Sequence, residues 1–231
     1  MVILKAVILA GGVGKRLRPL TLNKPKVMVP VKGEPMIAHI IRGLKPYVDE
    51  VILVVGYKKE VIIDYFGQEF EGLKISYVFQ EEFLGTGHAA LCAESKINES
   101  FLMIYGDLHF DQRVYEKILK QDSDGVIMAK TVPNPQDYGV LEVKDGLLVR
   151  ILEKVLNPPS NLINAGVYLL PLEVFKACHE LALSERGEYE LTDAVTQLIR
   201  EGFKFKVVVV DQWIDVGTPE RLSQANEMIF D

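Results

Sequence analysis

A glycine-rich stretch with basic residues follows the first apolar run of the chain, and such stretches often hold phosphate. It reads LAGGVGKRLRPLT, from Leu9 to Thr21. Glycines there let backbone N–H groups approach an anion closely, and Lys15 and Arg16 add positive charge. These residue types together suggest phosphate chemistry.

Two common phosphate loops come close to fitting this stretch. The P-loop requires G-x-x-x-x-G-K-[ST]; Gly14 and Lys15 supply the G-K, but Arg16 stands where the hydroxyl residue belongs. The dinucleotide fingerprint G-x-G-x-x-G fits at Gly12 and Gly14 and fails at Leu17. A nucleotide-dependent oxidoreductase is therefore disfavoured, and a glycine turn with solvated charges is the simple alternative.

Alternating strands and helices must position these residues. Apolar runs predict strands over 5–10, 51–56, 74–79, 101–107 and 125–130, and helical patterns occupy 35–44, 59–66, 86–95, 113–121 and 191–202. A last helix starts at the cap Thr218 with Pro219 in its first position. This order predicts an α/β fold with a mostly parallel sheet covered on both faces. Runs without helices near 138–170 predict added antiparallel strands.

Composition narrows the function classes. The chain has 231 residues, a net charge of −6 and 48% hydrophobic residues, as expected of one globular domain over 1–231. The negative charge argues against nucleic acid as a partner. No apolar run approaches the length of a membrane span. Two distant cysteines, Cys92 and Cys178, fit free thiols in the cytoplasm.

The stretch LAGGVGKRLRPLTLNKPKVMVPVKGEPMI resembles the signature of the sugar-1-phosphate nucleotidylyltransferases, L-A-G-G-x-G-x-R-L-x-P-L-T followed by P-K-x-M-x-P-V. QEEFLGTGHAA, IYGDLHF, YGVLEV, ILEK, NAGVYLL and WIDVGTPERL resemble later blocks of that family, in the same order. The resemblance implies the nucleotide-diphospho-sugar transferase fold, a Rossmann-like three-layer αβα arrangement. It also implies Mg²⁺ as cofactor and the reaction of an NTP with a sugar 1-phosphate to an NDP-sugar and pyrophosphate, by direct in-line attack on the α-phosphorus.

The resemblance further assigns roles to single residues. Arg16 and Lys26 would be catalytic contacts to the phosphates, and Asp107 and Asp215 would hold the metal. The residues expected to bind the nucleotide are Leu9, Ala10, Gly11, Gly12, Gly14, Lys15, Gln80, Gly85 and Thr86. Those expected to bind the sugar phosphate are Gly139, Glu153, Lys154 and Asn164. Because neighbours on a strand point to opposite faces, Glu153 and Lys154 can reach one ligand only at a strand end or bulge.

Substrate identity stays open between two groups at this point. The ending GEYELTDAVTQLI with WIDVGTPERL favours glucose 1-phosphate with UTP or dTTP, whereas residues 55–87 are closer to mannose- or heptose-1-phosphate guanylyltransferases. A catalytically silent, regulatory sugar-nucleotide binder is the alternative of another class, and a silent binder would have little need of both metal carboxylates. The chain ends soon after its last helix, so we expect no C-terminal β-helix domain, and any homo-oligomer would form through the catalytic domain.

Overall fold

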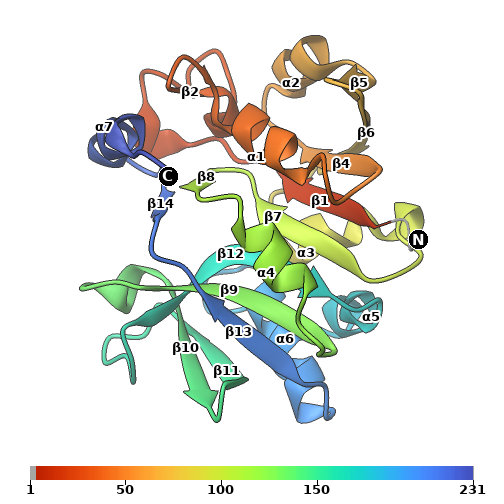
Figure 1. The fold of residues 1–231 in the computed structure, drawn as a ribbon, viewed down its shortest axis with the longest axis vertical. Coiled ribbons are helices and arrows are strands. Elements are labelled where there is room, and N and C mark those ends of the chain that lie inside the picture. The colour runs from red at the N-terminus through yellow and green to blue at the C-terminus, as the bar shows by residue number, and fades with distance from the viewer. Residues whose placement is uncertain (1–3, 231) are drawn as a thin grey trace.

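The structure is a computed structural model that describes residues 4–230. A ten-stranded sheet in the order β10-β11-β13-β9-β12-β7-β1-β4-β6-β5 forms its centre (Figure 1). Its strands are β1 (Lys5–Leu9), β4 (Glu50–Val55), β5 (Glu69–Phe70), β6 (Leu73–Phe79), β7 (Phe101–Tyr105), β9 (Gly125–Thr131), β10 (Gly139–Lys144), β11 (Leu147–Glu153), β12 (Leu162–Leu170) and β13 (Phe205–Val209). β6, β4, β1, β7, β9 and β13 run in one direction, while β12 lies antiparallel between β7 and β9. The predicted α/β class with added antiparallel strands is confirmed.

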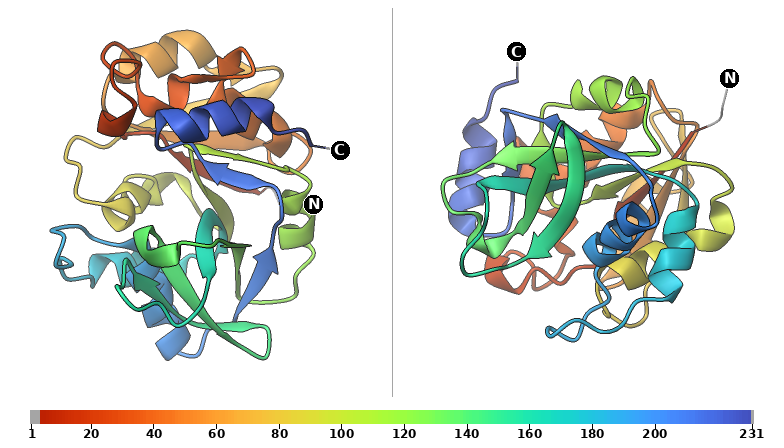
Figure 2. Two further views of the ribbon diagram at one scale, coloured as in Figure 1. Left: turned by 90° about the vertical axis from the view of Figure 1, so that its left-hand side faces the viewer. Right: turned by 90° about the horizontal axis from the view of Figure 1, so that it is seen from below.

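Helices cover both faces of this sheet. On one face α1 (Met36–Leu44), α2 (Lys59–Phe66) and α4 (Val114–Leu119) bury their apolar sides in one core. On the other face α3 (Thr86–Leu91), α5 (Glu173–His179) and α6 (Leu191–Arg200) form a second core; two further views show the layers (Figure 2). Because side chains alternate along a strand, Ala6 and Ile8 of β1 enter the first core and Val7 the second. Continuous apolar strands are the sequence signal of this double burial.

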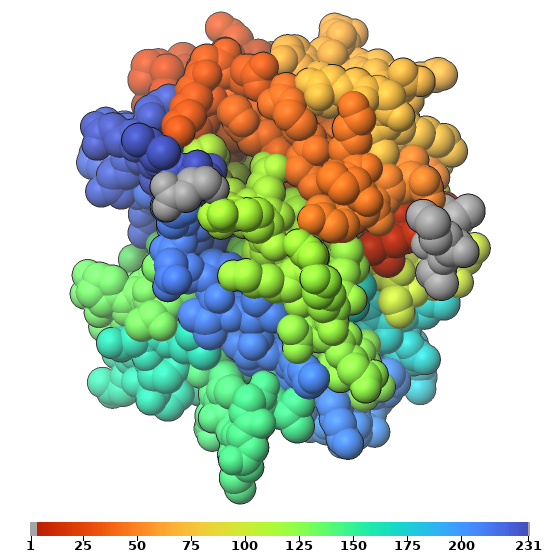
Figure 3. All heavy atoms as spheres, in the orientation of Figure 1, coloured from red at the N-terminus to blue at the C-terminus, as the bar shows by residue number. Residues whose placement is uncertain are grey.

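The glycine-rich stretch is held by a third, smaller core. Short 3₁₀ turns span Lys15–Leu17 and Lys26–Met28, and β2 (Pro30–Val31) pairs with β3 (Glu34–Pro35). Leu17 and Val29 are fully buried against Val216 and Ala225, the latter in α7 (Pro219–Glu227). Figure 3 shows this last helix, in blue, packed directly against the N-terminal third, in orange. The third core thereby fixes the stretch relative to the end of the chain.

Three features differ from the sequence prediction. Helix α3 ends at Leu91 and is followed by a separate 3₁₀ turn, Glu94–Lys96, rather than running on to 95. Helix α5 has no counterpart in the prediction, since it has only seven residues, among them Val174 and Phe175, which favour strands. The small pair β8 (Leu108–Phe110) and β14 (Trp213–Asp215) could not be foreseen, because it joins segments far apart in the chain. Among the described residues, no helix is long and apolar enough to cross a membrane.

Candidate functional site

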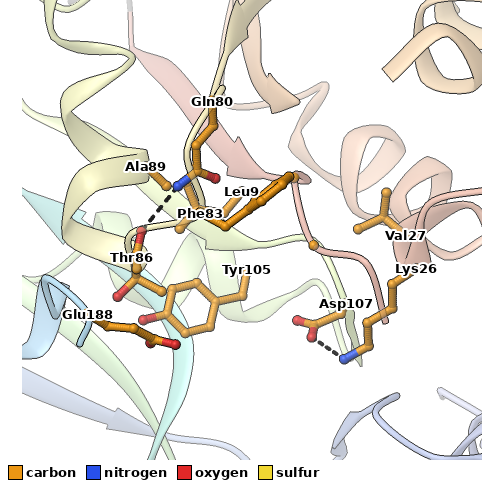
Figure 4. A pocket seen from close by; sticks show the side chains of 13 residues that line it. Leu9, Lys26, Val27, Gln80, Phe83, Thr86, Ala89, Tyr105, Asp107 and Glu188 are labelled. Carbon is orange, nitrogen blue, oxygen red and sulfur yellow. Dashed lines mark hydrogen bonds and ion pairs between the residues drawn. The ribbon is translucent and has the colours of Figure 1, made fainter. Parts of the chain in front are cut away.

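A cleft with two connected hollows opens at the carboxyl ends of β1 and β7. The Gln80 hollow, about 270 Å³, includes Leu9, Gly11, Gly12, Gln80 and Phe83 in its lining (Figure 4). The Glu153 hollow, about 230 Å³, is bounded by residues that include Arg16, Gly139, Glu153, Lys154, Asn164 and Asp215. Both hollows share Lys26, Thr86, Tyr105, Asp107 and Glu188. The shared residues therefore mark the place where two bound molecules would meet.

Lys26 lies between two carboxylates at this junction. Its ammonium donates to Asp107, toward which it points in Figure 4, and lies 3.5 Å from Oδ1 of Asp215. Pairing of β8 with β14 brings the two aspartates together, since Leu108 faces Asp215 in the register and Val216 N donates to the Asp107 carbonyl at 2.9 Å. Three segments that are distant in sequence thus converge on one charged centre.

The charges of this centre are strongly coupled. Burial by itself lowers the pKa of Lys26, but Asp107 and Asp215 outweigh it, so the net shift is upward. The pKa of Asp215 is raised by burial and by the neighbouring Asp107, although Lys26, Arg221 and Arg16 oppose the rise. Arg221 Nη1 lies 2.7 Å from Asp215 Oδ2. The two aspartates consequently repel one another even with these cations present, and further positive charge between them would relieve the repulsion.

This donor set fits a magnesium ion. Magnesium is usually held by one or two carboxylates together with water and substrate phosphate oxygens, and Asp107 and Asp215 are two such carboxylates with restricted exposure. Within residues 4–230 there is no group of three or more His, Cys, Asp or Glu side chains that would suit a metal bound by protein ligands alone. The arrangement suits an ion that reaches the site together with phosphate.

Arg16 reaches the same centre from the glycine-rich stretch. Its neighbour Leu17 is fully buried and anchors the turn, which leaves Arg16 exposed at the edge of the Glu153 hollow. A Cβ added to Gly217 would lie 3.2 Å from Arg16 Nη2 and 3.1 Å from Asp215 Oδ1. Gly217 therefore leaves room for the guanidinium and the carboxylate to come close to each other.

Gln80 is oriented by its surroundings in the lining of its hollow. Its Nε2 donates to the Gly85 carbonyl at 3.3 Å and lies 3.4 Å from Nδ1 of His88. Its Oε1 accepts no hydrogen bond from residues 4–230 and would lie 2.9 Å from a Cβ on Gly11. The half-exposed ring of Phe83 lies at the same end. This end of the hollow presents an acceptor beside an aromatic ring.

Gly85 and Thr86 join the Gln80 segment to a second loop, residues 184–190. A Cβ on Gly85 would lie 2.6 Å from the carbonyl oxygen of Tyr189 and 2.8 Å from its nitrogen. Thr86 Oγ1 accepts from Leu191 N at 3.0 Å and so caps α6 rather than its own helix α3. The missing side chain of Gly85 thus serves the packing of two loops.

Glu153 and Lys154 lie at a strand end, where two neighbouring side chains can reach the same ligand. Strand β11 ends at Glu153, and Lys154 adopts a left-handed backbone with φ of 47°. Both side chains line the Glu153 hollow, as a strand end allows. Thr192 Oγ1 donates to Glu153 at 2.9 Å, and burial raises the pKa of this carboxyl. Gly139 leaves space here, because a Cβ on it would lie 2.8 Å from Glu153 Oε1.

Asn164 enters the same hollow through a buried polar network. Its side-chain amide donates to the Tyr168 hydroxyl, which lies 3.2 Å from the Tyr105 hydroxyl, and its Oδ1 accepts from Gly166 N at 2.9 Å. Burial raises the pKa of Tyr105 and that of Tyr168, so both hydroxyls stay protonated. The network holds Asn164 and Tyr105 in fixed orientations.

Some of the expected residues stand apart, and others were missed. Ala10, Gly14 and Lys15 do not line either hollow: Ala10 is buried in the sheet, and Gly14 packs on Lys26. The lining residues that sequence reasoning did not single out include Phe83, Tyr105, Tyr138, Arg186, Glu188, Glu190 and Trp213. Arg186, Glu188 and Glu190 belong to the segment GEYELTD and its approach, whose resemblance was noted without a role for any of its residues. The resemblance of that segment was the signal in the sequence that could have pointed to these three residues.

Comparisons with known proteins show the family to which the chain belongs. A family profile described as nucleotidyl transferase matches residues 5–231. The chain belongs to the nucleotidyl transferase family. A relative named bifunctional protein GlmU, from Methanocaldococcus jannaschii, is 41% identical over 227 residues, which are 98% of this chain and 54% of the relative. The chain therefore spans about half the length of that relative.

Two other similar proteins match over nearly their full length. The UTP–glucose-1-phosphate uridylyltransferase AglF of Haloferax volcanii is 38% identical over 234 residues, 98% of this chain and 96% of the relative. A Bacillus anthracis structure assigned as a glucose-1-phosphate thymidylyltransferase has a TM-score of 0.88 at 28% identity, covering 99% of this chain and 97% of the other. The expected nucleotide-diphospho-sugar transferase fold is confirmed by this likeness.

Proposed function

We propose that this nucleotidyl transferase family member joins an NTP to a sugar 1-phosphate, forming an NDP-sugar and pyrophosphate. One observation carries the proposal: Lys26, Asp107 and Asp215 converge where the two hollows meet. The reaction brings two polyanions together, so charge neutralisation and positioning must supply most of its catalysis. A nucleotide in the Gln80 hollow and a sugar phosphate in the Glu153 hollow would place their phosphates at this centre.

The residues of the centre would have separate roles in binding phosphate, metal and sugar phosphate. Lys26 and Arg16 would bind phosphate oxygens of the NTP and keep the leaving pyrophosphate neutralised. Asp107 and Asp215 would hold Mg²⁺, which when bound withdraws charge from the phosphates. Lys154 would orient the sugar phosphate, whose oxygen attacks the α-phosphorus while the bond to the β-phosphate oxygen breaks. Because that attacking oxygen already carries negative charge, no side chain has to remove a proton from it.

The orientation of Gln80 favours some bases over others. With Nε2 turned toward Gly85 and His88, the free acceptor Oε1 faces the hollow. Uracil, thymine and guanine each carry a ring N–H that could donate to it, whereas cytosine and adenine present a ring acceptor at the equivalent edge. An unpaired acceptor against an acceptor would disfavour CTP and ATP. Similarity to AglF and to the Bacillus anthracis protein favours UTP or dTTP with glucose 1-phosphate.

A substrate panel tests the proposal. Purified protein with MgCl₂ is mixed with each of ATP, CTP, GTP, UTP and dTTP and with glucose, mannose or heptose 1-phosphate, and released pyrophosphate is measured. We expect the fastest release with glucose 1-phosphate and UTP or dTTP. Preference for GTP with mannose or heptose 1-phosphate would favour the guanylyltransferase alternative. No release in any combination would contradict the enzyme and favour the silent binder. Mg²⁺ dependence, a cytoplasmic location and assembly through this domain stay predictions.

A further inference from the structure

Arg186 is one of the cations that line the Glu153 hollow, and its charge is already neutralised by carboxylates. Its Nε lies 3.1 Å from Oε1 of Glu190, and its Nη2 lies 3.5 Å from Glu188 and 4.0 Å from Glu153. The side chain of Glu190 is only 4% exposed. Three carboxylates surround one guanidinium, so the group of Glu153, Glu188 and Glu190, here called the acidic ring, carries more negative charge than Arg186 can neutralise. Lys154 is a further cation that acts on Glu153.

The acidic ring is held in place by the backbone around it. Tyr189 N donates to the Leu84 carbonyl at 2.7 Å, and Gly87 N donates to the Tyr189 carbonyl at 2.7 Å. Ser184 Oγ donates to Glu190 at 3.2 Å. Because loop 184–190 is joined in this way to the segment that carries Gln80, the carboxylates cannot easily turn away from the hollow.

The Glu153 hollow therefore holds charges of both signs. Lys26 lies at the junction, where phosphates are proposed to bind, and Arg16 lines the same hollow. Of the acidic ring, Glu153 and Glu190 line only the Glu153 hollow, whereas Glu188 also borders the Gln80 hollow. Burial raises the pKa of the Glu153 carboxyl, and the charge of Glu190 adds to the rise, while the hydrogen bond from Thr192 and the charges of Arg186 and Lys154 oppose it. A sugar phosphate would bind with its phosphate near Lys26 and its sugar ring among the carboxylates of the acidic ring.

We propose that the acidic ring selects sugar 1-phosphates whose ring is neutral or carries an amine, and rejects those that carry a carboxylate. This selectivity rests on the function proposed above. To pair with an acidic sugar, Arg186 would have to leave Glu190, a buried carboxylate that would then lack its cation. Like charges placed together at such a site oppose binding strongly. A protonated amino group in place of a hydroxyl is attracted by the carboxylates of the acidic ring, so it carries no such penalty.

Three substrates and two matched variants test this selectivity. Values of kcat/KM are measured for glucose, glucosamine and glucuronic acid 1-phosphates with the preferred NTP at low ionic strength. We expect glucuronic acid 1-phosphate to be used at least about 100-fold less well than glucose 1-phosphate, and glucosamine 1-phosphate to be used within about 10-fold of it or better. Glu188→Gln should reduce the ratio of kcat/KM for glucose 1-phosphate to that for glucuronic acid 1-phosphate, here called the gap, by about 10-fold. Glu185→Gln removes one charge from the same loop outside the hollow and should leave the gap unchanged.

The outcomes distinguish a failure of the proposed selectivity from a failure of the proposed enzyme activity. Use of glucuronic acid 1-phosphate within about 10-fold of glucose 1-phosphate overturns the selectivity while the enzyme stands. Equal effects of E188Q and E185Q also overturn it, because they would show only long-range charge. If no sugar 1-phosphate reacts, the enzyme proposal fails, and affinities for UDP-glucose and UDP-glucuronic acid, measured calorimetrically, still test the ring. Equal affinities for the two UDP-sugars overturn the proposed selectivity. Binding of UDP-glucuronic acid that is at least about 10-fold weaker than binding of UDP-glucose supports it.

Discussion

Lys26 Nζ lies 3.5 Å from Asp215 Oδ1, although 189 positions separate the two residues in the chain. Asp107, which accepts a hydrogen bond from the same ammonium, completes the centre. One cation thus separates two carboxylates that would otherwise face each other in a partly buried place. The two carboxylates and the lysine can be tested separately. Replacing a carboxylate should show in kcat, and replacing the lysine should also show in the free energy of unfolding.

Replacing either aspartate should abolish most of the activity. In Asp107→Asn or Asp215→Asn the charge that would hold Mg²⁺ is lost, and we expect kcat to fall by about 1000-fold, as on removal of a main electrostatic group. Pyrophosphate release at saturating substrates measures the loss. Asp111→Asn is the control, since Asp111 pairs with Arg113 outside both hollows and should keep full activity. Full activity in D107N or D215N would remove that residue from the proposed metal site.

Removing the lysine charge should show in folding as well as in activity. Lys26→Met leaves Asp107 and Asp215 facing each other, and we expect the free energy of unfolding to fall by about 3 kcal/mol, the cost of breaking a buried ion pair. Added MgCl₂ should restore more stability in this variant than in the wild type, because the ion takes over the role of the ammonium. Urea unfolding with and without MgCl₂ measures both effects. Lys15→Met, at an exposed position outside the hollows, should change stability by less than about 0.5 kcal/mol. A K26M protein as stable as the wild type would show that the aspartates do not repel.

Local pattern was enough to predict the layers of the fold. For Glu153 it gave only a geometric condition, and the family resemblance supplied the expected role. Apolar strands such as β4, buried on both faces, announce a covered sheet, and adjacent Glu153 and Lys154 could share a ligand only at a strand end. Both conclusions follow from the directions in which successive side chains point along a single strand. These directions can be inferred from the sequence of that strand alone. The family resemblance added the candidate residues, which the structure gathers around one cleft apart from Ala10, Gly14 and Lys15.

Contacts between distant segments escaped prediction. Pairing of β8 with β14, which brings Asp107 beside Asp215, depends on register between two three-residue strands that have little pattern of their own. The ion pairs of Arg186 depend on how loop 184–190 lies on residues 84–87, and an exposed charged loop would show the same composition. Gly12 and Gly85 also look alike in sequence, yet only the second has a backbone neighbour in the place of its missing side chain.

Gly12 and Gly85 should respond differently to an added methyl group. In Gly85→Ala the new Cβ meets the Tyr189 backbone at 2.6 Å and φ is 104°, so we expect a loss of about 2 kcal/mol or more in unfolding free energy. In Gly12→Ala the Cβ has open space around it, and stability should be unchanged. Because Gly12 lines the Gln80 hollow, G12A should instead raise the KM for the NTP. Thermal unfolding and NTP kinetics separate the two effects. Equal stability of both variants would contradict the packing role of Gly85.

Glu153 should link pH to both stability and sugar binding. Burial raises the pKa of its carboxyl above the ordinary value of 4.5, so the folded protein holds this proton more tightly than the unfolded chain does. The charged form therefore costs stability at neutral pH, and the cost disappears as pH falls through the raised pKa toward 4.5. We expect Glu153→Gln, in which the side-chain oxygen can still accept from Thr192, to be more stable than the wild type at pH 8 and equally stable near pH 4.

The same substitution should weaken sugar binding, because a carboxylate accepts hydrogen bonds from sugar hydroxyls more strongly than an amide does. At pH 8 the KM for glucose 1-phosphate should rise by about 10-fold in E153Q. As pH falls, the KM of the wild type should rise toward that of the variant, whose own KM should change less. Denaturant unfolding and initial rates across pH 5–8 measure the two trends. A Glu153→Gln protein that is less stable at pH 8, with an unchanged KM, would show that the carboxylate is needed for the fold and makes no contact with the sugar.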